Sequence, residues 1–304
     1  MAMKIKHEIN SISNRTSVIF HLIAILGALI CVLPFILVIA ISVTDETAIM
    51  QEGYKFLPSK FSMDGYRFIF KNGELLSRAY LNTIMSTVAG TALNTLMIAL
   101  YAYPLSRPDF PYKKFFNTFI LILMLFNGGF VASYLVNVKV LMLKNTFMAL
   151  VLPSLGGGFY VFVTRTFFQS SIPYEIIESA KIDGCNENGI FWRLVLPLSL
   201  PVLAVNGLIN IYGFWNNWMN SLYYITDDKL YTLQYVMQQA LRDMQLMKSL
   251  AGSGSAELLN GAMTLPAESA RMAMVIVGIG PIIAVYPFLQ KYFVKGLTVG
   301  AIKG

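Results

Sequence analysis

The sequence predicts an all-α, polytopic integral membrane protein with six transmembrane helices. Of its 304 residues, 56% are hydrophobic and 13% are charged, and the mean hydropathy is +0.60. Soluble domains carry about 25% charged residues. The apolar residues gather into runs long enough to cross a bilayer, which takes about 20 residues in a helix. We predict a single transmembrane domain over 1–304, with spans at 18–43, 81–103, 115–136, 147–164, 198–218 and 272–293.

The first span follows a basic segment that contains Lys4, Lys6 and Arg15, an arrangement that also suits a signal peptide. The apolar run 18–43 is longer than the 7–15 or so residues of a signal peptide's apolar region. No clear small-residue cleavage site closes it. We therefore predict an uncleaved span with a kink at Pro34.

The fourth span is interrupted by Pro153 and by Gly156-Gly157-Gly158. Broken helices are tolerated in membranes where neighbouring helices or a cavity satisfy the freed backbone groups. Glycine also lets helices approach closely. Two interpretations follow, close helix packing or a contribution to a substrate path.

The charges indicate a membrane setting. The net charge is +7, but Lys and Arg lie in short segments between apolar runs, as expected for loops near anionic lipid. Nucleic-acid binders instead gather these residues on one polar face, so we predict membrane lipid and no nucleic acid as a partner. Cys31, Cys185, His7 and His21 lack metal-ligand spacing, and no metal site or disulfide is predicted.

The orientation follows from the density of basic residues. Lys and Arg divide almost equally between the two sides, but the segments assigned to the inside are shorter, so their basic density is higher. Most acidic residues fall outside. We predict that both termini are cytoplasmic.

Two long outer loops are predicted, 44–79 and 219–271. The first shows no clear period. In the second, apolar residues recur at three and four, which predicts an amphipathic helix; they are Leu233, Val236, Met237, Ala240, Leu241, Met244 and Met247. This helix either lies over the bundle or at the lipid interface, or provides a docking surface for an external partner.

The segment between spans four and five predicts a short helix, a tight turn and a second helix. Ser170 or Ser171 can cap the first helix, and Pro173 suits its first turn. Gly184 can adopt the left-handed conformation of a helix end. Asn186 can cap the second helix. A rigid unit of this kind can transmit the movement of a partner to the spans that carry it.

Its sequence, Glu178 to Gly184 and then Leu194 to Pro197, closely resembles the EAA loop of ABC-importer permeases. That loop reads E-A-A, three residues, G, nine residues, I-x-L-P, and the spacing fits without a gap. Ser179 and Leu194 are small departures. In that family the loop docks into a cytoplasmic ATPase. The resemblance implies a coupling loop over 170–197 with these coupling residues: Glu178, Ser179, Ala180, Asp183, Gly184, Arg193, Leu196 and Pro197.

The resemblance covers most of the chain. Ala102 to Arg107 is similar to the A-Y-x-L-S-R of carbohydrate permeases, Trp215-Asn216 to their W-N element, and 290–304 to their Q-x-Y-F-x-x-G-L…G-A-x-K-G tail. It points to the maltose-type importers, the shorter-permease type and the oligosaccharide branch. In maltose-type permeases the tail can touch the ATPases, which implies such contacts for Lys303 and Gly304.

The resemblance implies the permease subunit of an ATP-driven sugar importer in the bacterial inner membrane. The implied partners are a second homologous permease, two ATPase subunits and an extracytoplasmic solute-binding protein. The sequence has no G-x-x-x-x-G-K-[ST] motif, the phosphate-binding loop of many ATPases. We therefore expect no enzyme activity and no cofactor in this chain, with ATP and Mg²⁺ bound by the partner ATPases.

Sugars present hydroxyls and apolar ring faces, so a sugar path needs amides and aromatic rings. The candidates are Asn206, Asn210, Tyr212, Trp215 and Asn217, with Asn127 and Tyr134 as weaker ones. Polar side chains at membrane depth usually face the bundle or a cavity. Asparagine can also hold helices together, and tryptophan can belong to an interfacial aromatic belt.

Two other classes of protein fit the sequence less well. An ion-coupled secondary transporter usually needs ionisable groups within its spans, and the apolar cores of spans two to five contain no Asp, Glu, Lys or Arg. A non-transporting membrane scaffold subunit would not need the EAA spacing.

Overall fold

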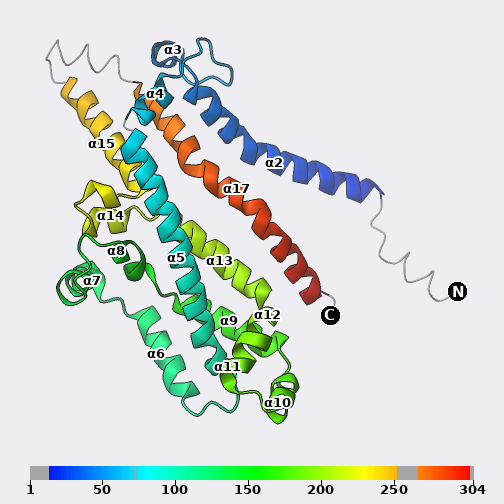
Figure 1. Ribbon diagram of the computed structural model, residues 1–304. Helices are drawn as coiled ribbons and strands as arrows, with labels where there is room; N and C mark the ends of the chain where they lie inside the picture. Colours follow the sequence, from blue (N-terminus) through cyan, green and yellow to red (C-terminus); the bar gives the residue numbers. More distant parts are fainter. Residues whose placement is uncertain (1–13, 72, 252–265, 302–304) are drawn as a thin grey trace. The chain divides into compact units, whose positions relative to one another are not determined.

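The computed structural model describes residues 14–71, 73–251 and 266–301 (Figure 1). They are helical, and the described residues contain no strand beyond an isolated bridge between Thr44 and Phe61. The chain forms two compact units. Unit 1 comprises residues up to 71 with 244–277, and unit 2 comprises 72–243 with residues from 278 onward.

Unit 1 begins with helix α2, Asn14–Ser42, which contains the predicted first span and has Pro34 inside it. Its most apolar window is not buried within the described chain. Large side chains along it are exposed, Phe20 by 59% and Ile30 by 62%. Such a surface is expected of a helix whose solvent is lipid.

The predicted outer loop 44–79 is partly helical. Two short helices occupy part of it, α3 (Glu46–Glu52) and α4 (Asp64–Phe70). Asp45 caps α3, since its carboxylate accepts a hydrogen bond from the Thr47 N–H at 3.1 Å. Helix α4 packs closely on the chain at Ser269, where a Cβ on Gly65 would lie 2.8 Å from a backbone carbon.

Glu46 caps the start of helix α17 (Ala267–Ala301), although the two are far apart in the sequence. The Glu46 side chain is buried, and its carboxylate accepts hydrogen bonds from the backbone N–H groups of Glu268, at 3.0 Å, and Ser269, at 3.1 Å. The first N–H groups of a helix have no partner within it, and a carboxylate there also complements the helix dipole.

We expect Glu46→Ala to fray the start of α17. Losing a helix cap costs about 1 kcal/mol, and backbone amide exchange at 267–270 should accelerate about fivefold. Hydrogen–deuterium exchange measures this. Glu52→Ala is the control, because Glu52 bonds only to the exposed local partners Lys55 and Ser59. Equal exchange in wild type and Glu46→Ala would contradict the capping role.

Unit 2 is built around helix α5, Gly73–Ser106, which packs against α13 (Leu200–Trp215) and α9 (Gly158–Ser171). The contact with α13 requires glycine, because a Cβ on Gly90 would lie 2.4 Å from the buried Phe214 ring. Helix α5 begins at Gly73 rather than near 81. The hydropathy pattern detected only the apolar part of a longer helix.

Two of the predicted spans contain a bend, and a third begins at one. Helix α6 (Lys113–Leu125) is followed, at 112°, by α7 (Gly129–Leu135) and the π-helical turn η1 (Val136–Val140). The prediction of one uninterrupted run over 115–136 therefore needs correction. Asn127-Gly128-Gly129 lies at the bend, where Gly129 has φ +82° and the Asn127 side chain accepts from its N–H.

The predicted interruption of span four is present. Helix α8 (Met148–Val151) and the 3₁₀ turn η2 (Leu152–Ser154) precede α9 at an angle of 64°. Gly156 and Gly157 have φ values of +142° and +116°, a region that favours glycine. The predicted span five, 198–218, corresponds to the single helix α13, and a bend of 79° at Ser199 separates α13 from the helix that ends at Leu198.

Among the described residues, two helices are long and apolar enough to cross a membrane, and up to five if each bent pair counts as one span. The two are Thr16–Ser42 and Gly73–Ser106. The sixth predicted span, 272–293, falls within α17. The count of six stays a prediction.

The predicted loop 219–271 contains helices α14 (Met219–Tyr224) and α15 (Leu233–Ala251) and the 3₁₀ turn η4 (Asp228–Leu230). The amphipathic helix is thus confirmed. In unit 2, Leu233 and Met237 are buried, and the Leu233 N–H donates to Thr83 Oγ1 at 2.8 Å. This start of α15 is fixed to α5. Residues 252–265 lie outside the described part.

Candidate functional site

The first helix of the predicted coupling loop is α10, Tyr174–Ile182. It ends as predicted at Gly184, which has φ +80°. The Gly184 N–H donates to Lys181 O at 3.0 Å, and the Cys185 N–H donates to Ala180 O at 2.9 Å. These two bonds form a Schellman motif, the glycine-dependent helix end.

The second helix begins as predicted at Asn186, whose side chain accepts from the Gly189 N–H at 2.7 Å. It continues through α11 (Glu187–Ile190), a π-helical turn η3 (Phe191–Val195) and α12 (Leu196–Leu198).

The start of α10 differs from the prediction. Ser170 and Ser171 do not cap α10, because both lie in the last turn of α9. Pro173 directly precedes the first residue of α10 and makes no side-chain cap. Proline cannot donate a backbone hydrogen bond and disfavours a helical residue before it, so α9 ends there.

One side of the helix–turn–helix is buried against the rest of unit 2. Ile177, Ala180, Ile190 and Phe191 join a core cluster that includes Ala102 at the end of α5. Ile176, the neighbour of Ile177 on α10, is 41% exposed. The buried side ties the helix–turn–helix to α5.

The opposite side is exposed and contains most of the predicted coupling residues. Glu178, Ser179, Asp183, Gly184, Arg193 and Pro197 are exposed, Leu196 is half-buried and Ala180 is buried. Two large apolar residues of the helix–turn–helix that were not predicted are also exposed, Ile182 by 86% and Trp192 by 54%. Exposed apolar side chains beside charged ones are typical of a protein-binding surface.

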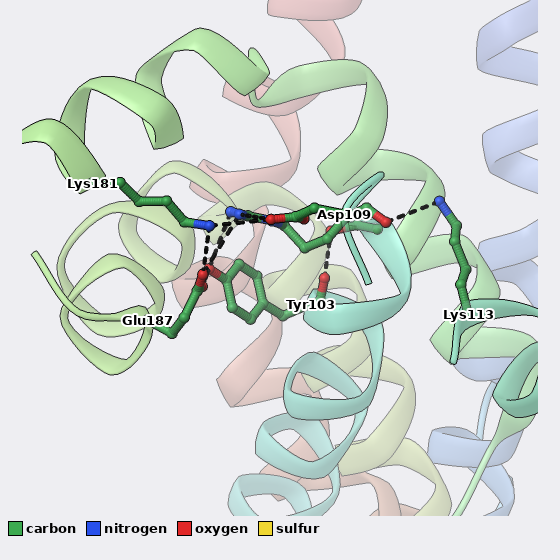
Figure 2. A network of polar contacts seen from close by, with 7 residues as sticks. Tyr103, Asp109, Lys113, Lys181 and Glu187 are labelled. Carbon is green, nitrogen blue, oxygen red and sulfur yellow. Dashed lines mark hydrogen bonds and ion pairs between the residues drawn. The ribbon is translucent and has the colours of Figure 1, made fainter. Parts of the chain in front are cut away.

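A polar network, not predicted, fixes the helix–turn–helix to the end of α5 (Figure 2). Its centre is Arg107, which is 4% exposed. Arg107 Nε and Nη2 each donate to a carboxylate oxygen of Asp109 at 3.0 Å, the two-pronged geometry that guanidinium favours. Lys181 Nζ lies 3.1 Å from Asp109 Oδ2 and 2.9 Å from Glu187 Oε1. The Tyr103 hydroxyl donates to Glu187 at 2.6 Å.

The network keeps its charges over a wide pH range. Hydrogen bonds from Arg107, and then from Lys181, hold the pKa of Asp109 well below its ordinary value. Bonds to Glu187 and then Asp109 raise the pKa of Lys181. Asp109 makes its full contribution to the free energy of unfolding above its ordinary pKa, and this contribution is lost as pH falls through the lowered pKa. The contribution of Lys181 is lost only as pH rises through its raised pKa.

Four of the seven candidate path residues form hydrogen bonds between segments of unit 2. The Asn206 amide donates to Thr164 Oγ1 at 2.7 Å, and its Oδ1 is buried without a partner. Asn210 donates to Thr95 at 3.0 Å. Trp215 Nε1 donates to Gly278 O at 2.8 Å and Asn217 donates to Ser154 Oγ at 2.6 Å. This geometry matches the alternative in which asparagines hold helices together.

The other three candidates lie elsewhere. Tyr212 is 67% exposed on α13. Asn127 is exposed at the bend after α6, and Tyr134 stacks on Tyr224 with ring centres 5.9 Å apart. The structure does not bring the seven residues into one cluster, and their role in a substrate path stays a prediction. Lys303 and Gly304 lie outside the described residues.

Asn94 was missed and joins three segments of unit 2. It is buried on α5, its amide donates to Asn210 Oδ1 at 2.8 Å, and its own Oδ1 accepts from the Gly156 N–H at 2.9 Å. A buried polar residue inside an apolar run is the signal that could have revealed it.

We expect Asn94→Leu to destabilise unit 2, because it leaves the Gly156 N–H and the Asn210 carbonyl without their partner. Each lost bond of this kind costs about 1 kcal/mol. Thermal unfolding of the purified protein in detergent should shift down by several degrees. Asn216→Leu is the control, since the Asn216 amide bonds only within its own helix, to Tyr212 O. An unchanged melting temperature in Asn94→Leu would contradict the bridging role.

The long apolar helices define the class of the protein, an integral membrane protein. The sequence matches the family described as "Binding-protein-dependent transport system inner membrane component" over residues 95–299. The chain belongs to this family. It is therefore a multi-pass inner membrane protein and a permease subunit of an ABC importer, which excludes the ion-coupled transporter and the scaffold.

Curated relatives support the family over almost the whole chain. The polygalacturonan/rhamnogalacturonan transport system permease protein YtcP of Bacillus subtilis (strain 168) is 38% identical over 280 residues, 91% of this chain and 94% of that protein. Protein LplC of the same organism is 37% identical over 275 residues, 90% of each chain.

A solved structure gives the same answer for the fold. A chain of a bacterial ABC transporter involved in the import of the acidic polysaccharide alginate superposes with a TM-score of 0.76. It is 27% identical in sequence, and the match covers 93% of this chain and 100% of that chain.

Proposed function

We propose that this chain is a permease subunit of an ATP-driven importer for oligosaccharides. The helix–turn–helix carries the proposal, because one side is fixed to α5 and the other exposes Glu178, Ile182 and Trp192. A movement imposed on the exposed side would pass through the buried side into the central helix. A relative named for polygalacturonan/rhamnogalacturonan transport and a structural neighbour involved in the import of alginate support sugar polymers as the substrate class.

The proposed complex contains a second homologous permease, two ATPase subunits and an extracytoplasmic solute-binding protein. The ATPases bind ATP and Mg²⁺, and this chain contributes no ATPase activity of its own. The exposed side of the helix–turn–helix docks into an ATPase, which places both termini in the cytoplasm. Lys303 and Gly304 contact the ATPases in this arrangement.

The substrate path is proposed along α13 and the break before α9. Tyr212 is the candidate with an exposed ring that can stack on a sugar. Asn206, Asn210, Trp215 and Asn217 are hydrogen-bonded to neighbours, so in this proposal they shape the path. Asn127 and Tyr134 are the weaker candidates.

The test is gentle extraction of the N-terminally tagged chain from its native membrane, followed by identification of the proteins that remain bound. We expect an ATPase, a second permease and a binding protein, and ATP hydrolysis stimulated by an oligosaccharide-loaded binding protein. Recovery of the chain alone, under conditions that keep a known importer intact, would refute the proposal.

A further inference from the structure

A cavity of about 310 Å³ opens at the end of unit 2 where α5 ends, α6 begins and α9 meets α10. Its lining includes Ser106, Arg107, Lys113, Gln169, Ser170 and Tyr174. We propose that this cavity binds the phosphate headgroup of an anionic phospholipid. The proposal depends on the proposed function only for the leaflet, which is the cytoplasmic one.

Two neighbouring cations lack a counter-ion here, Lys113 in the lining of the cavity and Arg165 on α9, one turn before the lining residue Gln169. Lys113 Nζ donates to the Arg107 backbone carbonyl at 3.2 Å, which leaves it two N–H donors (Figure 2). Arg165 Nη1 donates to Asn117 at 3.2 Å, while its Nε is buried without a partner. Within the described residues, the ion pairs include no carboxylate for Lys113 or Arg165.

The arrangement of α6 and α9 holds these charges together. Lys113 and Asn117 are one turn apart on α6, and Arg165 and Gln169 are one turn apart on α9, so each pair shares a helix face. The charges of Lys113 and Arg165 repel each other. A charge taken out of water without a partner is costly, and a phosphate between them would remove that cost. Arg107 differs because Asp109 already neutralises it.

The surroundings favour a lipid over a soluble anion. Along α6 and just before it, Tyr112, Phe115 and Leu123 are at least 60% exposed, as expected next to acyl chains and headgroups. An apolar groove of about 240 Å³ follows α5 and α6; its lining is Leu100, Tyr101, Pro104, Leu105, Phe110 and Phe116. The headgroup cavity and the apolar groove both border the short connection between α5 and α6. Basic pockets between transmembrane helices on the cytoplasmic side bind lipid headgroups.

The experiment uses the intact importer in phosphatidylcholine nanodiscs that contain a small fraction of phosphatidylglycerol. Native mass spectrometry counts the phosphatidylglycerol that the complex retains on release from the disc. We expect wild type to retain it and Lys113→Gln to retain about fivefold less, as for the loss of one cation near an anionic lipid. Lys113→Arg should restore retention. Lys114→Gln is the matched control, since Lys114 is exposed at the next position.

A second variant leaves both cations in place. Gln169→Glu is isosteric and adds a carboxylate to the cavity wall, so we expect it to pair with the cations and expel the lipid. Equal retention in wild type, Lys113→Gln and Gln169→Glu would overturn the proposal. It would also be overturned if inorganic phosphate displaced the lipid at millimolar concentration, or if lipid bound only after removal of the ATPases. Lipid retention is measured without any transport assay. The lipid proposal can therefore fail while the proposed function stands.

Discussion

Gly184→Val is expected to leave the permease inserted in the membrane but separated from its ATPase. Gly184 has φ +80°, and no other atom lies within 4 Å of a Cβ built there. The expected damage is therefore backbone strain and not a steric clash. The left-handed region costs an ordinary residue about 1–2 kcal/mol, and a β-branched residue more. The helix end at Lys181 and Ala180 would open, and the exposed side of α10 would lose its fixed geometry.

The amount of ATPase that co-purifies with the tagged chain measures the effect, together with uptake of labelled oligosaccharide. We expect at least a tenfold loss of both in Gly184→Val. Gly184→Asn is the matched control, because asparagine tolerates the left-handed region, and it should retain most of the ATPase. Normal ATPase retention and uptake in Gly184→Val would refute the coupling role of this turn.

The turn was predictable because its signals are local. Gly184 ends α10 and Asn186 caps α11 through bonds to residues no more than five positions away. Such bonds need no knowledge of the fold. The broken span at Gly156 was predictable for the same reason, since glycine and proline disrupt helices wherever they occur.

The hydropathy pattern was less informative about where helices begin and bend. Helix α5 starts with the polar turn that contains Glu74 and Arg78, which pair with each other. The polar residues of this turn can continue the helix, but they are not apolar, so a hydropathy pattern does not include them. The bend after α6 was missed although Asn127-Gly128-Gly129 contains a turn signal, because apolar residues on both sides made the run appear continuous.

Contacts between distant residues could not be predicted. Glu46 caps a helix at Glu268, and Asn94 bonds to Asn210. The composition of each segment is compatible with many partners, and only the packed fold selects one. The candidate path residues show the same limit. Asn206 and Asn210 lie on one helix face, and the sequence does not decide whether that face contacts substrate or a neighbouring helix. In the structure their amides bond to Thr164 and Thr95.

Arg107→Met is expected to uncouple ATP hydrolysis from transport. Arg107 links the end of α5 to both parts of the helix–turn–helix. It bonds to Asp109, lies 3.6 Å from Glu187 Oε1, and its guanidinium carbon is 5.2 Å from the centre of the Tyr174 ring. Without it, Asp109 and Glu187 are two carboxylates near a single Lys181. The helix–turn–helix can then move without carrying α5 with it.

The size of the effect of Arg107→Met depends on how exposed the carboxylate partners of Arg107 are. Hydrogen bonds to charged groups contribute about 1.5–3 kcal/mol each, but the Asp109 and Glu187 side chains are 43% and 55% exposed, so solvent screening reduces their contribution. A net loss of about 1–2 kcal/mol lowers the ratio of sugar transported to ATP hydrolysed by roughly five- to thirtyfold. The ratio is measured in proteoliposomes that contain the complete importer.

Two variants separate this role from a general loss of stability. Arg107→Lys keeps the charge but not the two-pronged geometry, so it should fall between wild type and Arg107→Met. Arg78→Met removes a half-exposed arginine that pairs with Glu74 at the other end of α5, and it should leave the ratio unchanged. If Arg107→Met kept the wild-type ratio, the network would only stabilise the fold, and movement would have to reach α5 through the buried apolar side, Ile177 and Phe191 against Ala102.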